Sequence, residues 1–221
     1  MLLLAPPLPA QVRKPGGVGR KSHQHSVTFG HATPTKLFVG PNEQQSIELN
    51  IRPLYVDGNL KEFTSGDTHD VTDRTFVVRR VFRINDVLPD DPKAAPHWKW
   101  QRDGWLLVNR STGRVSPVTL PEFDPYYSAA SWYRDYVAYC GISSNGEKLY
   151  AMVMQIGQRR PLAKHALGAA PGGDAPDSAC PAPEWQRTPV RVTFQPQGGQ
   201  KLAFELHGSA AELVNPEETK N

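Results

Sequence analysis

The sequence has few of the features that assign a chain to a common functional class. It contains only 2 cysteines, and they do not form the Cys-x-x-Cys pairs of structural zinc sites. It also lacks a phosphate-binding glycine loop and the Gly-x-Ser-x-Gly turn of esterases. Nucleotide hydrolysis, esterase chemistry and structural zinc are therefore not indicated.

Long apolar runs and strong charge are missing as well. Apolar stretches such as 149–158 are about half of the roughly 18 residues that a membrane-spanning helix requires. The formal net charge is only +3, and the basic residues are interspersed with acids and form no continuous stripe. We predict no membrane span and no cofactor, and we do not expect nucleic acid as a partner.

Proline and glycine, in contrast, are abundant, with 21 prolines and 18 glycines among 221 residues. Proline lacks an amide donor and interrupts helices, and no amphipathic pattern extends over the length of an ordinary helix. The composition therefore predicts short strands connected by many turns.

Alternating apolar and polar residues indicate half-buried strands. Ile47, Leu49 and Ile51 share one side of such a segment, and Thr75–Asn85 shows the same period. Tight-turn sequences that favour hairpins occur at Asp57–Gly58, Ser111–Gly113, Ser144–Gly146 and Gly198–Gly199. A further turn is predicted at Asp103–Gly104, between a strand over 97–102 and a strand over 105–110.

Two segments, Trp105–Leu120 and Tyr136–Val153, each contain two strands joined by a short Gly turn. They resemble the blades of propeller proteins of the TolB or WD-repeat kind. The ordered part, at roughly 155 residues, is too short for four blades of about 40 to 45 residues each. We therefore predict an all-β fold, an antiparallel meander that forms a sandwich or partly open barrel. The alternative is a partial propeller-like stack of blades.

Composition also divides the chain. Residues 1–10 read MLLLAPPLPA, which indicates a truncated signal peptide; the alternative is a disordered apolar terminus. We predict a flexible, basic and glycine-rich lead over 11–35, one β domain over 36–207 and a polar tail over 208–221. Inside that domain, 168–184 is rich in Gly, Ala and Pro and is predicted to be a linker or an excursion.

The predicted state of Cys140 and Cys180 depends on whether the chain is exported. In an oxidising compartment they are predicted to form a disulfide, whereas a reducing cytosol would keep both as thiols. We expect a periplasmic or extracellular location, with a cytoplasmic one as the alternative.

Aromatic residues are concentrated between positions 98 and 139, which include four of the 5 tryptophans and five of the 7 tyrosines. The more common use of such residues is an aromatic core, since each buries roughly 150–250 Å². The alternative is a stacking platform for a carbohydrate or a peptide, because these rings have an apolar body and a polar edge. The candidate platform residues are Trp98, Trp100, Tyr126 and Tyr127.

The candidates for catalysis are few. Asp67, His69 and Asp70 lie close together before a predicted strand, but their spacing differs from that of a calcium loop. Glu122 and Asp124 could act as a carboxylate pair in glycoside hydrolysis. We predict no metal site, and the candidates for one are His23, His25 and His31, whose rings suit transition metals.

The favoured interpretation is therefore a non-enzymatic, exported β domain with a binding or structural role, whose partner is a carbohydrate, a peptide or a protein. The alternative is a hydrolase that acts on a glycan or similar substrate through its carboxylates. The sequence leans toward binding, because the aromatic concentration is its strongest feature and the acidic candidates match no catalytic motif.

Overall fold

The computed structural model describes residues 25–39, 45–87, 95–170 and 180–216, so the predicted signal peptide at 1–10 lies outside the described part. Within that part the chain forms strands and turns, and no helix that could cross a membrane is present. All strand pairs are antiparallel and belong to three sheets, none of which closes into a barrel through hydrogen bonds among the described residues. The predicted all-β class is confirmed.

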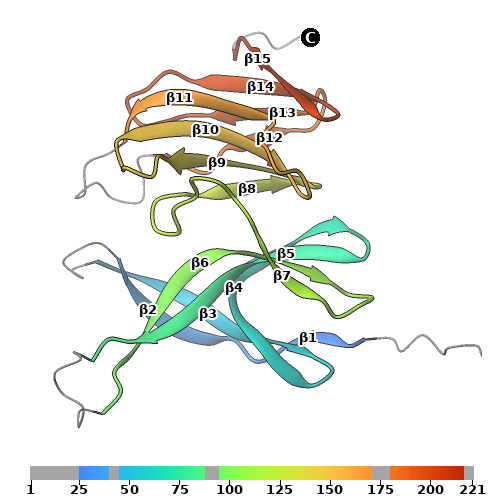
Figure 1. The fold of residues 1–221 in the computed structure, drawn as a ribbon, viewed down its shortest axis with the longest axis vertical. Helices are drawn as coiled ribbons and strands as arrows, with labels where there is room; N and C mark the ends of the chain where they lie inside the picture. Colours follow the sequence, from blue (N-terminus) through green and yellow to red (C-terminus); the bar gives the residue numbers. More distant parts are fainter. Residues whose placement is uncertain (1–24, 40–44, 88–94, 171–179, 217–221) are drawn as a thin grey trace, which may run out of the picture.

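Sheet A occupies one end of the molecule and sheets B and C the other, as Figure 1 shows. Sheet A contains β1 (Val27–Phe29), β2 (Thr33–Val39), β3 (Gln45–Val56), β4 (Asn59–Thr72), β5 (Thr75–Asn85), β6 (Trp98–Asn109) and β7 (Val115–Val118). Sheet B contains β8 (Ala130–Tyr133), β9 (Tyr136–Ile142), β10 (Lys148–Gln155) and β11 (Ala163–Ala169). Sheet C contains β12 (Glu184–Gln186), β13 (Arg191–Phe194), β14 (Leu202–His207) and β15 (Ala210–Val214).

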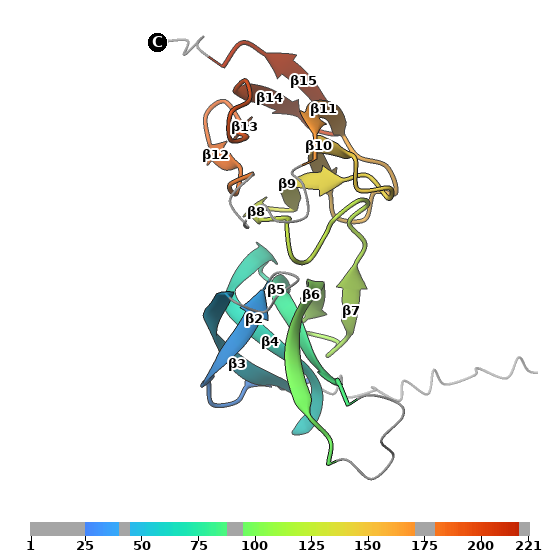
Figure 2. The same ribbon diagram turned by 90° about the vertical axis from the view of Figure 1, so that its left-hand side faces the viewer.

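Sheet A curls on itself, which is visible in Figure 2. β1 and β2 both pair with β3, and β2 also approaches β6 from the other side of the curl. At the β6–β7 turn, Gly113 has φ +65° and a Cβ there would lie 2.6 Å from Val56 Cγ1. Only glycine fits this contact, because it tolerates a positive φ and has no Cβ. The enclosed core contains Leu54, Phe76, Val78, Leu106 and Val108.

Sheets B and C are four-stranded meanders whose strands follow one another in sequence order. They pack face to face, with β8 beside β12 and β11 beside β15. Phe194, Phe204 and Val192 fill the space between them. The two sheets form a sandwich in which each layer has the strand order of a propeller blade.

The segment that connects sheet A to sheet B runs from β7 to β8 and covers the outer face of sheet B. Leu120 and Phe123 from this segment pack on Tyr139 and Met152 of β9 and β10. Sheet B is therefore covered on both faces, which explains why β9 is buried over most of its length.

The four predicted tight turns are confirmed by the pairing of their flanking strands. Asp57 and Gly58, for example, have φ 53° and 76°, as a two-residue hairpin requires. The turn predicted at Asp103–Gly104 is wrong, because β6 runs through it. These two residues lie opposite the single residue Arg80, which is the arrangement of a β-bulge.

Two predicted boundaries are also wrong. β1 and the start of β2 lie within the predicted lead at 11–35, and β15 lies within the predicted tail at 208–221. In both places, pairing with β3 or β14 satisfies the backbone of a short segment that the composition of its neighbours had concealed. At 168–184, Gly168 and Ala169 belong to β11 and Glu184 begins β12, while 171–179 lies outside the described residues.

Candidate functional site

Most of the aromatic segment joins the sheets. Trp105 of β6 meets Trp132 of β8 edge to face, with ring centroids 5.2 Å apart. Tyr133 stacks on Trp185 of sheet C at 5.6 Å, and Tyr139 is fully buried. For these residues the core interpretation is correct.

Arg79 and His69 complete the junction between sheets A and B. The Arg79 guanidinium lies 5.0 Å from the Phe123 ring centroid, and its Nη2 donates a 2.8 Å hydrogen bond to the Pro125 carbonyl. Burial lowers its pKa to about 10, so it stays charged at neutral pH. His69 Nε2 lies 2.8 Å from the Arg134 carbonyl, and its ring stacks on Trp132. The predicted catalytic histidine therefore has a structural position.

Trp98 and Trp100 lie at the far end of β6. They occupy alternate positions of one strand, so they share a face. Trp98 is 52% exposed, whereas Trp100 is partly covered by the edge of Phe63, with ring centroids 5.1 Å apart. Arg83 of β5 places its guanidinium 4.9 Å from the centroid of the Trp98 ring. We call these four residues the Trp98 surface.

Tyr126 and Tyr127 are half-buried and do not join the Trp98 surface as a pair. Their backbone amides both donate to Asp124 Oδ1, at 2.7 and 3.2 Å, which fixes the turn between β7 and β8. Burial raises the pKa of the Tyr126 hydroxyl, and Asp124 contributes while Arg102 opposes. Arg102 lies two positions after Trp100 on the same face of β6.

Tyr127 lines a hollow of about 430 Å³ together with Glu122, Asp124, Ser143 and Ser144. Glu122 has φ 58°, and its carbonyl accepts a 2.7 Å hydrogen bond from the Ile142 amide. Its Oε1 accepts from Lys164 at 2.8 Å, which raises the pKa of Lys164. Its Oε2 is buried and has no hydrogen-bond partner among the described residues. The two predicted carboxylates thus reach one hollow, but Asp124 caps a turn and Glu122 pairs with a lysine.

Asp67, His69 and Asp70 are not gathered. Asp67 is exposed, and Asp70 forms a 2.6 Å ion pair with Arg110, whereas His69 points into the junction. In the part of the chain that the structure describes, no group of three or more His, Cys, Asp or Glu side chains is arranged to bind a metal.

The metal candidates are separated as well. His25 Nδ1 lies 2.7 Å from Asp57 Oδ2, where it connects the start of β1 to the β3–β4 turn. His31 is exposed in the loop between β1 and β2, and His23 lies outside the described residues. His25 therefore has a structural partner.

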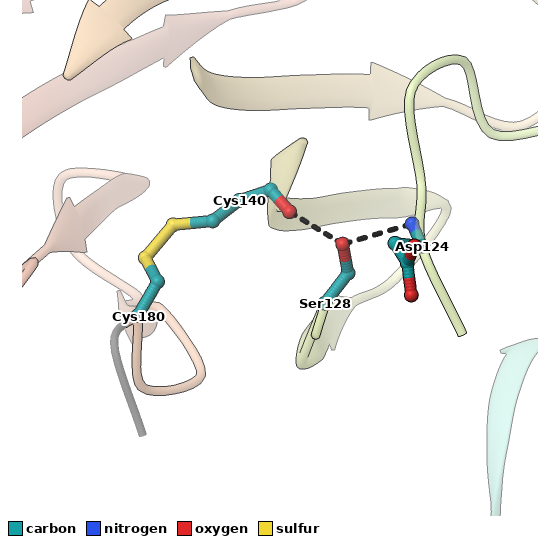
Figure 3. The surroundings of a disulfide bond; sticks show 4 residues. All are labelled: Asp124, Ser128, Cys140 and Cys180. Atoms are coloured by element: carbon teal, nitrogen blue, oxygen red, sulfur yellow. Dashed lines mark hydrogen bonds between the residues drawn. A yellow bond between two sulfur atoms is a disulfide. The ribbon is translucent and has the colours of Figure 1, made fainter. Parts of the chain in front are cut away.

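Cys140 and Cys180 form the predicted disulfide, with their Cα atoms 6.3 Å apart. Figure 3 shows that the bond joins β9 to the segment before sheet C, next to Ser128. Ser128 Oγ donates a 2.6 Å hydrogen bond to the Cys140 carbonyl. Both cysteines are buried, so the bond is part of the core between sheets B and C.

Sequence reasoning missed Arg83 and Phe63, the two partners of the exposed end of β6. The signal for Arg83 was present, since it follows two residues after Val81 on a strand of clear alternation. Its register against Trp100 depended on the bulge at Asp103–Gly104, which the turn prediction concealed.

Comparisons with protein-family models, with curated proteins and with solved structures find no match to this chain.

Proposed function

We propose that this chain is an exported carbohydrate-binding module and that the Trp98 surface is its binding site. The observation that carries the proposal is the 52% exposure of Trp98. Exposing a large indole to water is unfavourable, and Trp98 is not isolated, because Trp100 and Phe63 continue the aromatic surface beside it; contiguous exposed apolar surface marks interaction sites. Sugar rings have apolar C–H faces and hydroxyl edges, which match an indole that is apolar in its plane and polar at one edge.

Export is supported by the disulfide. Disulfides persist in oxidising compartments and are rare in the cytosol, and this one crosses the core between sheets B and C. A buried position protects it from reductants and gives it a structural role.

Binding is favoured over hydrolysis by the partners of the acidic residues. Asp70 pairs with Arg110, Glu122 with Lys164, and Asp124 accepts from backbone amides. These carboxylates therefore have structural partners within the protein. The observation that favours a hydrolase is the unpartnered Glu122 Oε2 beside the hollow, so Glu122→Gln is the variant that tests it.

The proposal is tested by a glycan and peptide array with the purified protein and a Trp98→Ala variant. We expect glycan binding that falls at least about tenfold in the variant, because a buried aromatic contact contributes roughly 1.5–3 kcal/mol. Leu213→Ala is the matched control, since Leu213 is 49% exposed on β15 at the other end of the molecule.

The control should leave binding unchanged, and both variants should unfold at the temperature of the parent. Binding to peptides alone would replace the carbohydrate by a peptide ligand. Glycan binding that Trp98→Ala leaves intact would remove the Trp98 surface as the site, and glycan cleavage lost in Glu122→Gln would favour the hydrolase.

A further inference from the structure

The two faces of the β5–β6 pair differ in whether their cationic side chains have carboxylate partners. On the face opposite the Trp98 surface, Arg80 pairs with Glu62 at 3.0 Å and with Asp103 at 2.9 Å. Lys99 on the same face pairs with Asp86 at 2.6 Å. These cations have carboxylates as immediate partners, so this face is electrostatically satisfied by the protein itself.

The Trp98 surface is different. Arg83 is exposed, and within the described residues it forms no ion pair. The Arg83 guanidinium instead makes a cation–π contact with the Trp98 ring. This contact holds the guanidinium beside the ring without neutralising its charge. The donors on its outer edge stay available for an anion.

A guanidinium fixed against an indole is a preorganised receptor for a carboxylate. Arginine has a planar fork of donors that matches two carboxylate oxygens, and charge-assisted hydrogen bonds of this kind are about twice as strong as neutral ones. The stacking contact also reduces the conformational entropy that a free arginine would lose on binding. The indole beside it supplies the apolar face for the ring of the ligand.

We infer that the Trp98 surface selects acidic polysaccharides, with Arg83 binding the carboxylate of a sugar whose ring lies on Trp98. The inference rests on the proposed carbohydrate-binding function and gives the chemical class of its ligand. Nucleic acid is the less suitable polyanion, because it requires a continuous basic stripe along the phosphates. Here Arg80 and Lys99 lie on the other face and are already paired, and Arg83 and Arg102 on the face of Trp100 are two cations, which do not make a continuous stripe.

The test uses the full chain and three polyuronates, namely polygalacturonate, alginate and hyaluronan, each beside its carboxyl-reduced form. Reduction converts the carboxylate into a hydroxymethyl group and leaves the sugar ring in place. We expect at least one polyuronate to bind about tenfold more tightly than its reduced form, because a charged hydrogen bond is lost. Arg83→Gln should remove this difference, whereas Trp98→Ala should weaken both forms.

Arg114→Gln is the matched control, because Arg114 is also exposed and carries the same charge, but lies at the β6–β7 turn. It should leave the preference for the acidic form intact. Equal weakening by Arg83→Gln and Arg114→Gln, or equally tight binding to single-stranded DNA, would mean general charge attraction and would overturn the inference.

The two proposals fail in different ways. Trp98-dependent binding to reduced or neutral polysaccharides with no preference for the acidic form would overturn the role of Arg83 and leave the binding function standing. Absence of binding to every polysaccharide in both forms would overturn both proposals.

Discussion

The two ends of the molecule bury their apolar side chains in different ways. Sheet A curls until β2 approaches β6, so a single sheet encloses its own core around Leu54 and Val78. Sheets B and C have four strands each and pack face to face, so each depends on the other for its core. Trp98 is exposed at the start of β6 in sheet A, and the disulfide joins β9 to the segment before β12 within the core of the stacked sheets. The exposed aromatic surface and the covalent bond therefore belong to different cores of the molecule.

The largest expected effect separates the two cores. Phe194→Ala should destabilise the stacked sheets by about 3–5 kcal/mol, because it leaves a cavity in a fully buried site. Leu54→Ala should destabilise sheet A by about 2–5 kcal/mol. Hydrogen exchange measured by mass spectrometry should show faster exchange over 191–206 in the first variant and over 75–85 in the second. Equal acceleration of both regions by either variant would mean that the two ends unfold as one unit.

Removing the disulfide is expected to have a slightly smaller effect on the same stack. Its cysteines are 40 positions apart, and closing a loop of this size contributes about 3–4 kcal/mol in the chain-entropy model. Cys140→Ala combined with Cys180→Ala should lower the urea midpoint of the B–C stack and leave exchange in sheet A unchanged.

Dithiothreitol is the control for this prediction. It should lower the midpoint of the parent protein and have no effect on the double variant. Two free thiols in protein taken from its native compartment would contradict both the bond and the proposed export.

The smallest expected effect concerns the exposed end of sheet A, where an ion pair between Lys99 and Asp86 stabilises the β5–β6 pair. The hydrogen bond from Lys99 holds the pKa of Asp86 below its ordinary value of 3.8, and His97 adds to this. The ion pair therefore stabilises the hairpin above pH 3.8, and this contribution is lost as the pH falls through the lower pKa of the folded state.

A carboxyl titration followed by NMR should locate the pKa of Asp86 below that ordinary value, and Lys99→Met should raise it. An Asp86 that titrates identically in both proteins would show that the face opposite the Trp98 surface is not neutralised as described.

Local sequence patterns were sufficient for the hairpins and not for the edges. Asn145–Gly146 and Asp57–Gly58 specify turns because few residues tolerate a positive φ, and the flanking alternation needs no tertiary information. β1 and β15 are only 3 and 5 residues long, too short to show a clear alternation, so their pairing depends on the partner strands β3 and β14. Asp103–Gly104 carries a turn sequence, but long pairing with β5 on both sides converts it into a bulge.

The candidate site shows the same division. Sequence reasoning selected Trp98 and Trp100 together with Tyr126 and Tyr127, since composition does not distinguish a tryptophan in a core from one on a rim. The curl of sheet A and the packing of sheet B against it decide which is which: Trp105 is enclosed by Trp132, and Trp98 on the same strand is not.

By itself, the sequence determined the all-β class, the tight turns and the presence of two cysteines that could form a disulfide. Each of these follows from backbone conformation or from chemistry within a few residues. Only the tertiary structure decided how the strands divide into three sheets, that the two cysteines meet in one core, and that Arg83 lies against the Trp98 ring. These depend on contacts between residues that are distant in the chain, and no local pattern encodes which faces of two sheets meet.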